Sequence, residues 1–147
     1  MRILLQRASR AEVRVEGEET RAIGPGLVAL VGVGPGDDAA VAARLAEKTA
    51  VLRVFEGEKG RFDRSLKDVG GAALVVSQFT LYADASKGRR PDLGGAARPE
   101  AAEPVVRAYA EALAAQGVPV KTGTFGARMQ VELVNDGPVT LWLDSAC

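Results

Sequence analysis

The chain has 147 residues, of which 47% are hydrophobic and 26% are charged, and its formal net charge is zero. These values predict a single domain, residues 1–147, that is large enough to bury a core. Zero net charge excludes a global field that would recruit nucleic acid or a membrane, so an RNA contact must come from a local basic patch. The sequence shows no apolar run of membrane-span length, no secretory leader and a single cysteine, which predicts a cytoplasmic protein without a disulfide framework.

Histidine is absent from the sequence. Its absence excludes Ser-His-Asp and Cys-His catalysis and any histidine-ligated zinc site. An enzyme with this sequence lacks the usual general base near neutral pH. Its chemistry must therefore rest on electrostatics, positioning, a perturbed carboxylate or lysine, or a group of the substrate.

The first half of the chain is predicted to contain strands and tight turns around one helix. Strands are predicted at residues 2–7, 11–16, 19–23 and 27–33. In 11–16, valines alternate with charged residues, which is typical of a half-buried strand. A helix is predicted to follow Asp37, its N-cap, and to end near Leu52. Residues 51–55 then lead into a hairpin whose return includes Phe62.

The second half is organised around residues 72–76, an apolar run that predicts a buried strand. Around it we expect irregular chain at 65–69, a loop at 84–98, a helix at about 100–116, and strands at 118–121, 129–134 and 139–143. Asn135-Asp136-Gly137-Pro138, between the last two strands, has the composition of a hairpin turn, and its Gly-Pro bond is of the kind that can be cis. The order lacks βαβ repetition and predicts an α+β fold, a mostly antiparallel or mixed sheet curled into a barrel-like core with two covering helices.

Polar groups follow the buried strand at Ser77-Gln78-Phe79-Thr80. Hydroxyls, an amide and free backbone N–H groups at the rim of a rigid sheet suit small-molecule chemistry, although such groups also serve only to satisfy neighbouring backbone. Two further features have two interpretations each. Lys87, Arg89 and Arg90 form either a solvated loop or a phosphate contact, and Phe125 is either a core side chain or a stacking surface.

Together these motifs resemble the D-aminoacyl-tRNA deacylase family, also called D-tyrosyl-tRNA deacylases. The resemblance runs over nearly the whole chain and is carried by Met1-Arg2 with Gln6-Arg7, Ile23-Gly24-Pro25-Gly26-Leu27, Ser77 to Asp84, Lys87-Gly88-Arg89-Arg90-Pro91, and Val134-Asn135-Asp136-Gly137-Pro138-Val139-Thr140. Its most specific part is the joint occurrence of Ser77-Gln78-Phe79-Thr80 and Asn135-Asp136-Gly137-Pro138 in this order and spacing.

The resemblance implies a homodimer, with active sites at the interface, that hydrolyses the ester between a D-amino acid and the terminal ribose of tRNA without a metal or an organic cofactor. Its implied site residues are Ser77, Gln78, Phe79 and Thr80 in the pocket, Gly137 and Pro138 as a cis chirality filter in the partner's site, Arg7 behind that filter, Phe125 and Met129 at the pocket mouth, and Lys87, Arg89 and Arg90 on tRNA phosphates. A filter that blocks L side chains lets glycine pass, so mischarged glycyl-tRNA is also an expected substrate.

Alternatives remain open for the chemistry. Backbone N–H groups near Phe79 and Thr80 can stabilise an oxyanion while the 2′-hydroxyl of the substrate assists, which leaves Thr80 a positioning role. Thr80 can instead be a covalent nucleophile, as in a hydrolase of small esters. A non-catalytic module that binds RNA or protein is favoured by the basic loop and disfavoured by the zero net charge and the 5% aromatic content.

Overall fold

The computed structural model describes residues 1–146 and is built on a six-stranded sheet. Its strands are β1 (Arg2–Val15), β2 (Arg21–Ile23), β3 (Gly26–Gly32), β6 (Ala72–Ser77), β7 (Val120–Thr122) and β8 (Met129–Asp144). A separate two-stranded sheet contains β4 (Arg53–Gly57) and β5 (Gly60–Ser65). The helices are α1 (Ala39–Val51), the short α2 (Leu66–Val69) and α3 (Pro99–Ala115), with a 3-10 turn, η1 (Phe79–Tyr82).

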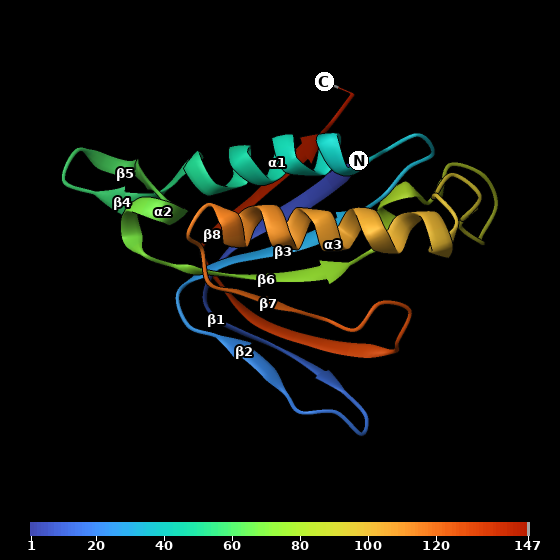
Figure 1. Cartoon of the computed structure of the whole chain (residues 1–147), viewed down its shortest axis with the longest axis horizontal. Helices are drawn as coiled ribbons and strands as arrows, with labels where there is room; N and C mark the ends of the chain where they lie inside the picture. The colour runs from blue at the N-terminus through green and yellow to red at the C-terminus, as the bar shows by residue number, and fades with distance from the viewer. Residues whose placement is uncertain (147) are drawn as a thin grey trace.

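The long strand β1 is the centre of the sheet and is paired along both edges. β8 runs antiparallel along one edge, while β3 and β2 share the other, opposite residues 2–8 and 11–13. β6 and β7 extend the sheet from β3 in parallel. The sheet is therefore mixed, and Figure 1 shows it strongly curved, with β1, β2 and β8 turning away from β3 and β6.

Side chains are buried on both faces of the curved sheet. Figure 1 shows α1 and α3 side by side over one face, where Leu45, Tyr109 and Leu113 join the larger core. The smaller core, on the opposite face, contains Ala8, Ala11, Val13, Ile23, Val28, Leu74 and Val76. Because strand side chains alternate in direction, β6 contributes Val75 to the first core and Leu74 to the second, which explains its continuous apolar run. Within residues 1–146, no helix has the length and apolar character needed to cross a membrane.

The α+β prediction is confirmed, with α1 and α3 as the covering helices and β4–β5 as the predicted hairpin. Three local predictions were wrong. Residues 2–7 and 11–16 are one strand, because β8 pairs with both parts across two register shifts. The N-cap of α1 is Asp38, whose carboxylate accepts from the Val41 N–H, and not Asp37. Residues 65–69 are not irregular, since Ser65 and Asp68 form a capping box that begins α2.

The predicted hairpin at Asn135-Asp136-Gly137-Pro138 is also wrong, because this segment is a projection within the single strand β8. Gln6 pairs with Thr140 and Ala8 with Asn135, so residues 136–139 have no partner on β1. We call residues 136–139 the elbow. The Asn135 amide closes it by donating to the carbonyls of Arg7 (3.0 Å) and Val139 (2.9 Å), and the Gly137–Pro138 bond is cis. Pairing of both flanks with β1 overrides the local turn preference.

Candidate active site

The polar segment after β6 forms the turn η1 at the rim of the sheet. Its start is fixed because the Gln78 N–H donates to the carbonyl of Val31, at 2.7 Å. The next two backbone N–H groups, of Phe79 and Thr80, have no hydrogen-bond acceptor among residues 1–146. The buried strand therefore presents two free, adjacent donors on a rigid support, which is the arrangement needed to bind an oxyanion.

The turn η1 forms one wall of a cavity of about 570 Å³. The predicted site residues that line it are Ser77, Gln78, Phe79, Phe125 and Met129, whereas Thr80 is not among its lining residues. The other walls come from β3, residues 93–98 and the first turns of α3, and they are mainly apolar. No cluster of histidine, cysteine or acidic side chains suited to a metal ion occurs in residues 1–146. The cavity joins the rim of β6 to the loop after β7 and is the candidate active site.

Thr80 lies on the exposed side of η1. Its hydroxyl oxygen accepts a hydrogen bond from the side-chain amide of Gln78. An amide donor cannot remove the hydroxyl proton, and this is the one side-chain contact of the Thr80 hydroxyl within the described chain. The geometry therefore favours a positioning role for Thr80 over that of an activated nucleophile.

The loop that carries Phe125 is held at the cavity mouth by the β1–β2 hairpin. Arg21 donates through Nε to the Thr122 carbonyl (2.8 Å) and through Nη2 to the Thr124 hydroxyl (2.6 Å). Arg21 Nη1 (3.0 Å) and the Thr124 hydroxyl (2.8 Å) both donate to Glu18. The bonds from Thr124 and then Arg21 hold the pKa of Glu18 below its ordinary value. Phe125 itself packs against the larger core on one side and lines the cavity on the other.

The elbow with Gly137 and Pro138 lies elsewhere in the same chain. Arg7, only 8% exposed, donates through Nε to the Asp136 carbonyl (2.9 Å) and through Nη1 to the Val54 carbonyl (2.8 Å), which ties the elbow to β1 and β4. A Cβ on Gly137, whose φ is +128°, would lie 2.9 Å from Arg7 Nη2, so only glycine fits. The elbow borders a second cavity of about 490 Å³ that shares no lining residue with the first. A single chain thus does not bring the elbow and η1 together.

The predicted basic residues Lys87, Arg89 and Arg90 lie at the tip of a surface loop. The loop is closed at its base, where Asp84 and Asp92 exchange two backbone hydrogen bonds of 2.8 Å. All three cations are exposed, and none takes part in an ion pair within residues 1–146. Leu93, next to the base, lines the cavity, so these charges lie on the segment that leads to it.

Sequence reasoning missed the residues that support the cavity from outside. Arg21 and Glu18 give no local signal, because their partner Thr124 is about 100 residues away in the chain. Arg2 lies against η1, with its guanidinium carbon 4.3 Å from the centre of the Tyr82 ring. Arg2 and Tyr82 both fall in segments that carry the family resemblance, and this was the available signal.

Comparison with known proteins agrees with the geometry. The family model for D-Tyr-tRNA(Tyr) deacylase matches residues 4–144. The chain is 62% identical over 146 residues to the D-aminoacyl-tRNA deacylase of Thermomicrobium roseum, covering 99% of this chain and 95% of that protein. It is 59% identical over 146 residues to the protein of the same name from Roseiflexus castenholzii, covering 99% and 93%.

Two solved structures share the fold. One, described as c-Myc DNA Unwinding Element Binding Protein, has a TM-score of 0.90 at 40% identity and covers 98% of both chains. The other, described as a probable eukaryotic D-amino acid tRNA deacylase, has a TM-score of 0.82 over 97% of both chains, and at 16% identity it shows the fold alone. The family match and the names of these relatives define the class of protein, a hydrolase that acts on ester bonds. The chain belongs to the D-Tyr-tRNA(Tyr) deacylase family, as its motifs predicted.

Proposed function

We propose that this protein hydrolyses the ester between a D-amino acid and the terminal ribose of tRNA, and so removes D-amino acids before translation uses them. The family match over residues 4–144 and the shared name of relatives at 62% and 59% identity support the deacylase activity. The observation that carries the mechanism is the pair of free backbone N–H groups of Phe79 and Thr80 beside the cavity. Because the proposed substrate is a charged tRNA, we also propose that the protein acts in the cytoplasm.

The chemical step needs stabilisation of a developing negative charge more than it needs a strong base. Water attack on the ester carbonyl forms a tetrahedral oxyanion, which the N–H groups of Phe79 and Thr80 can bind. One such donor contributes about 3–4 kcal/mol in known enzymes. The 2′-hydroxyl next to the ester is held in the same complex and can assist proton transfer, so that no histidine is required. The Gln78 side-chain amide donates to the Thr80 hydroxyl oxygen and so restrains that hydroxyl next to the two donors.

A second copy of the chain is proposed to complete the site. Three large apolar side chains of β8 are exposed, Trp142 (50%), Val134 (42%) and Val131 (36%), and a protein partner docked along this strand could cover them. Val131 also lines the cavity, so a copy docked on β8 reaches the cavity mouth. The elbow belongs to the same strand and does not contact the cavity of its own chain. An isologous dimer would therefore place each elbow at the cavity of the partner.

The elbow is proposed to select the D enantiomer. Gly137 and Pro138 are exposed and outside the β1 ladder, so their carbonyl groups lack ladder partners within the described residues. Arg7 holds the segment rigid from behind. Two fixed carbonyls can accept from the α-ammonium group of the amino acid and leave no room for a side chain in the L direction. Selection then depends on main-chain geometry and works for D side chains of many sizes.

Incubation with D-Tyr-tRNA and L-Tyr-tRNA tests the activity. Release of tyrosine from the D form alone is expected. Release from neither form would instead support a non-catalytic binding module, and hydrolysis of small esters without tRNA would support a Thr80 nucleophile.

Complementation tests the shared site. A Gly137→Ala chain has a damaged elbow, and a Ser77→Trp chain has a filled cavity. If sites are shared between copies, a mixed dimer of the two inactive variants contains one intact site and recovers activity. If each chain used its own elbow, the mixture would stay inactive.

A further inference from the structure

We propose that Arg2 is a positioning residue for the reaction: it holds the turn η1 at its Leu81–Tyr82 end and so fixes the two backbone donors of Phe79 and Thr80. The inference rests on the proposed function, because it assigns a support to the proposed oxyanion site. Arg2 touches neither the cavity nor the reacting atoms, since it is not among the lining residues.

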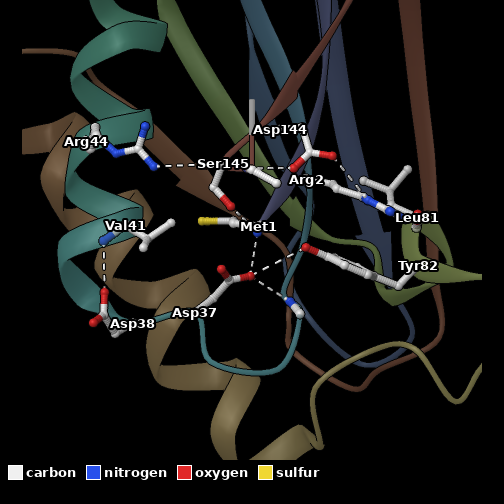
Figure 2. A network of polar contacts seen from close by, with 12 residues as sticks. Met1, Arg2, Asp37, Asp38, Val41, Arg44, Leu81, Tyr82, Asp144 and Ser145 are labelled. Atoms are coloured by element: carbon white, nitrogen blue, oxygen red, sulfur yellow. Dashed lines mark hydrogen bonds and ion pairs between the residues drawn. The ribbon is translucent and has the colours of Figure 1, made fainter.

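The Arg2 guanidinium makes two contacts with η1 and one ion pair with β8. Nη1 donates to the carbonyl of Leu81 at 3.0 Å, and the guanidinium carbon lies 4.3 Å from the centroid of the Tyr82 ring. The buried Nε lies 3.5 Å from the Asp144 carboxylate of β8, as an ion pair without a hydrogen bond. Figure 2 shows Arg2 between Asp144 and the Leu81–Tyr82 end of the turn. The planar Arg2 guanidinium thus joins the C-terminal end of η1 to strand β8.

Tyr82 is confined on the side that faces β3. A Cβ on Gly34 would lie 2.7 Å from the Tyr82 hydroxyl, and a Cβ on Gly32 would lie 3.1 Å from the Leu81 Cβ. The hydroxyl reaches Asp37 at 3.5 Å, and Asp37 accepts from the Gly34 N–H at 2.7 Å (Figure 2). The Asp37 carboxylate also lies 2.5 Å from the Met1 ammonium group. The ring is therefore held between glycine backbone on one side and the Arg2 guanidinium on the other.

The turn η1 needs such support because its own hydrogen bonds are few and weak. Its bonds to its flanks are Leu81 N–H to the Gln78 carbonyl (3.2 Å) and Ala83 N–H to the Thr80 carbonyl (3.0 Å), and the hydrogen bonding of 3-10 turns is geometrically poor. Its two leading donors are free. Without Arg2, the turn can rotate on Gln78, and a displacement of about 1 Å is enough to impair a positioned catalytic group.

The same strand supports both halves of the proposed site. Arg2, near the start of β1, holds η1, while Arg7, five residues later, holds the elbow through Asp136. In the proposed dimer, β1 of one chain therefore fixes its own oxyanion donors and also the elbow that enters the partner.

The test is the Arg2→Met variant, which keeps an unbranched stem about as long as that of arginine up to Nε and removes the guanidinium. In deacylation of D-Tyr-tRNA, kcat is expected to fall at least 10-fold while KM stays within 3-fold, because oxyanion donors act in the transition state and not in substrate binding. Arg2→Lys keeps the charge and one donor and is expected to recover at least 3-fold in kcat. The matched control is Arg64→Met, since Arg64 also donates to a main-chain carbonyl, that of Asp68 at 2.9 Å, and lines neither the candidate active site nor the cavity beside the elbow.

The outcomes separate the two proposals. If the wild-type protein does not deacylate D-Tyr-tRNA, the proposed function is refuted. If the wild type is active and Arg2→Met has the same kcat and KM, only the proposed role of Arg2 is refuted. A KM increase with unchanged kcat, or no recovery with Arg2→Lys, would also overturn it. If Arg2→Met does not fold, Tyr82→Leu removes the ring under the guanidinium and must show the same loss of kcat at constant KM, or the inference fails.

Discussion

Replacement of Arg21 by methionine is expected to weaken substrate binding and to leave the chemical step nearly intact. Arg21 makes the two hydrogen bonds that join the β1–β2 hairpin to Thr122 and Thr124 of the Phe125 loop. Methionine fills the same stem volume and makes neither bond. The Glu18–Thr124 bond of 2.8 Å remains, so the loop becomes mobile but is not released. Substrate must then order the Phe125 loop when it binds.

The size of the effect follows from the bonds lost. Two hydrogen bonds at about 0.5–1.5 kcal/mol each give about 1–3 kcal/mol, and the partial exposure of the Arg21 side chain (24%) favours the lower half of this range, about 1–2 kcal/mol. Since about 1.4 kcal/mol corresponds to tenfold in affinity, KM should rise about 5- to 30-fold. The donors of Phe79 and Thr80 lie on a different segment, so kcat should stay within about 3-fold.

Steady-state deacylation of D-Tyr-tRNA measures both constants. Arg44→Met is the matched control, because Arg44 also donates to a main-chain carbonyl, that of Ser145 at 3.3 Å, and takes no part in the hydrogen bonds that hold the Phe125 loop. An unchanged KM in Arg21→Met, or a loss confined to kcat, would refute the view that this loop contributes binding through its attachment to the hairpin.

Four further outcomes are expected. Thr80→Ala should retain substantial turnover, and complete loss in a folded, tRNA-binding variant would indicate a nucleophile instead. Glycyl-tRNA should be hydrolysed, and if it proved as inert as an L-aminoacyl-tRNA the exclusion model of the elbow would fail. Thr49→Val should destabilise the protein by about 1–3 kcal/mol in denaturant unfolding, and by more than Tyr109→Phe does. The buried Thr49 hydroxyl donates to the Leu45 carbonyl (2.8 Å) and therefore accepts from the Tyr109 hydroxyl (2.9 Å). Valine at position 49 would leave the buried Tyr109 hydroxyl without an acceptor. Burial raises the pKa of Tyr82 from 10.0 to about 12. The neutral phenol therefore stabilises the folded state below pH 10, and this stabilisation is lost as the pH rises toward 12. A Tyr82→Phe variant that loses stability equally steeply at alkaline pH would contradict this prediction.

Local patterns were sufficient for most of the elements. The run at 72–76 predicted β6, because a strand buried on both faces must be apolar at every position. The periodicity of the two helices placed α1 and α3 within one or two residues of their observed bounds. The family resemblance named Ser77, Gln78, Phe79, Phe125 and Met129, and the structure brings these five to one cavity. In each case the determining information lies within a short segment.

Other features depend on partners that are distant in the chain. The composition of residues 135–138 favours a hairpin turn, but Asn135 and Thr140 both pair with β1, which makes residues 136–139 an elbow within one strand. Arg2 and Arg21 look like ordinary surface cations in the sequence, and their roles come from Leu81 and Thr124, about 80 and 100 residues further on. Separation of the elbow from the cavity is likewise a property of the folded chain.

The sequence by itself thus determined the fold class, the family and five of the residues that line the cavity, because periodicity and motif composition can be read from short segments. Only the tertiary structure decided that residues 136–139 project from a continuous β8, that the Phe79 and Thr80 donors are free within the described residues, and that Arg2 and Arg21 bond to Leu81 and Thr122. These features arise from strand pairing and hydrogen bonds between distant segments, whose geometry exists only once the curved sheet has formed.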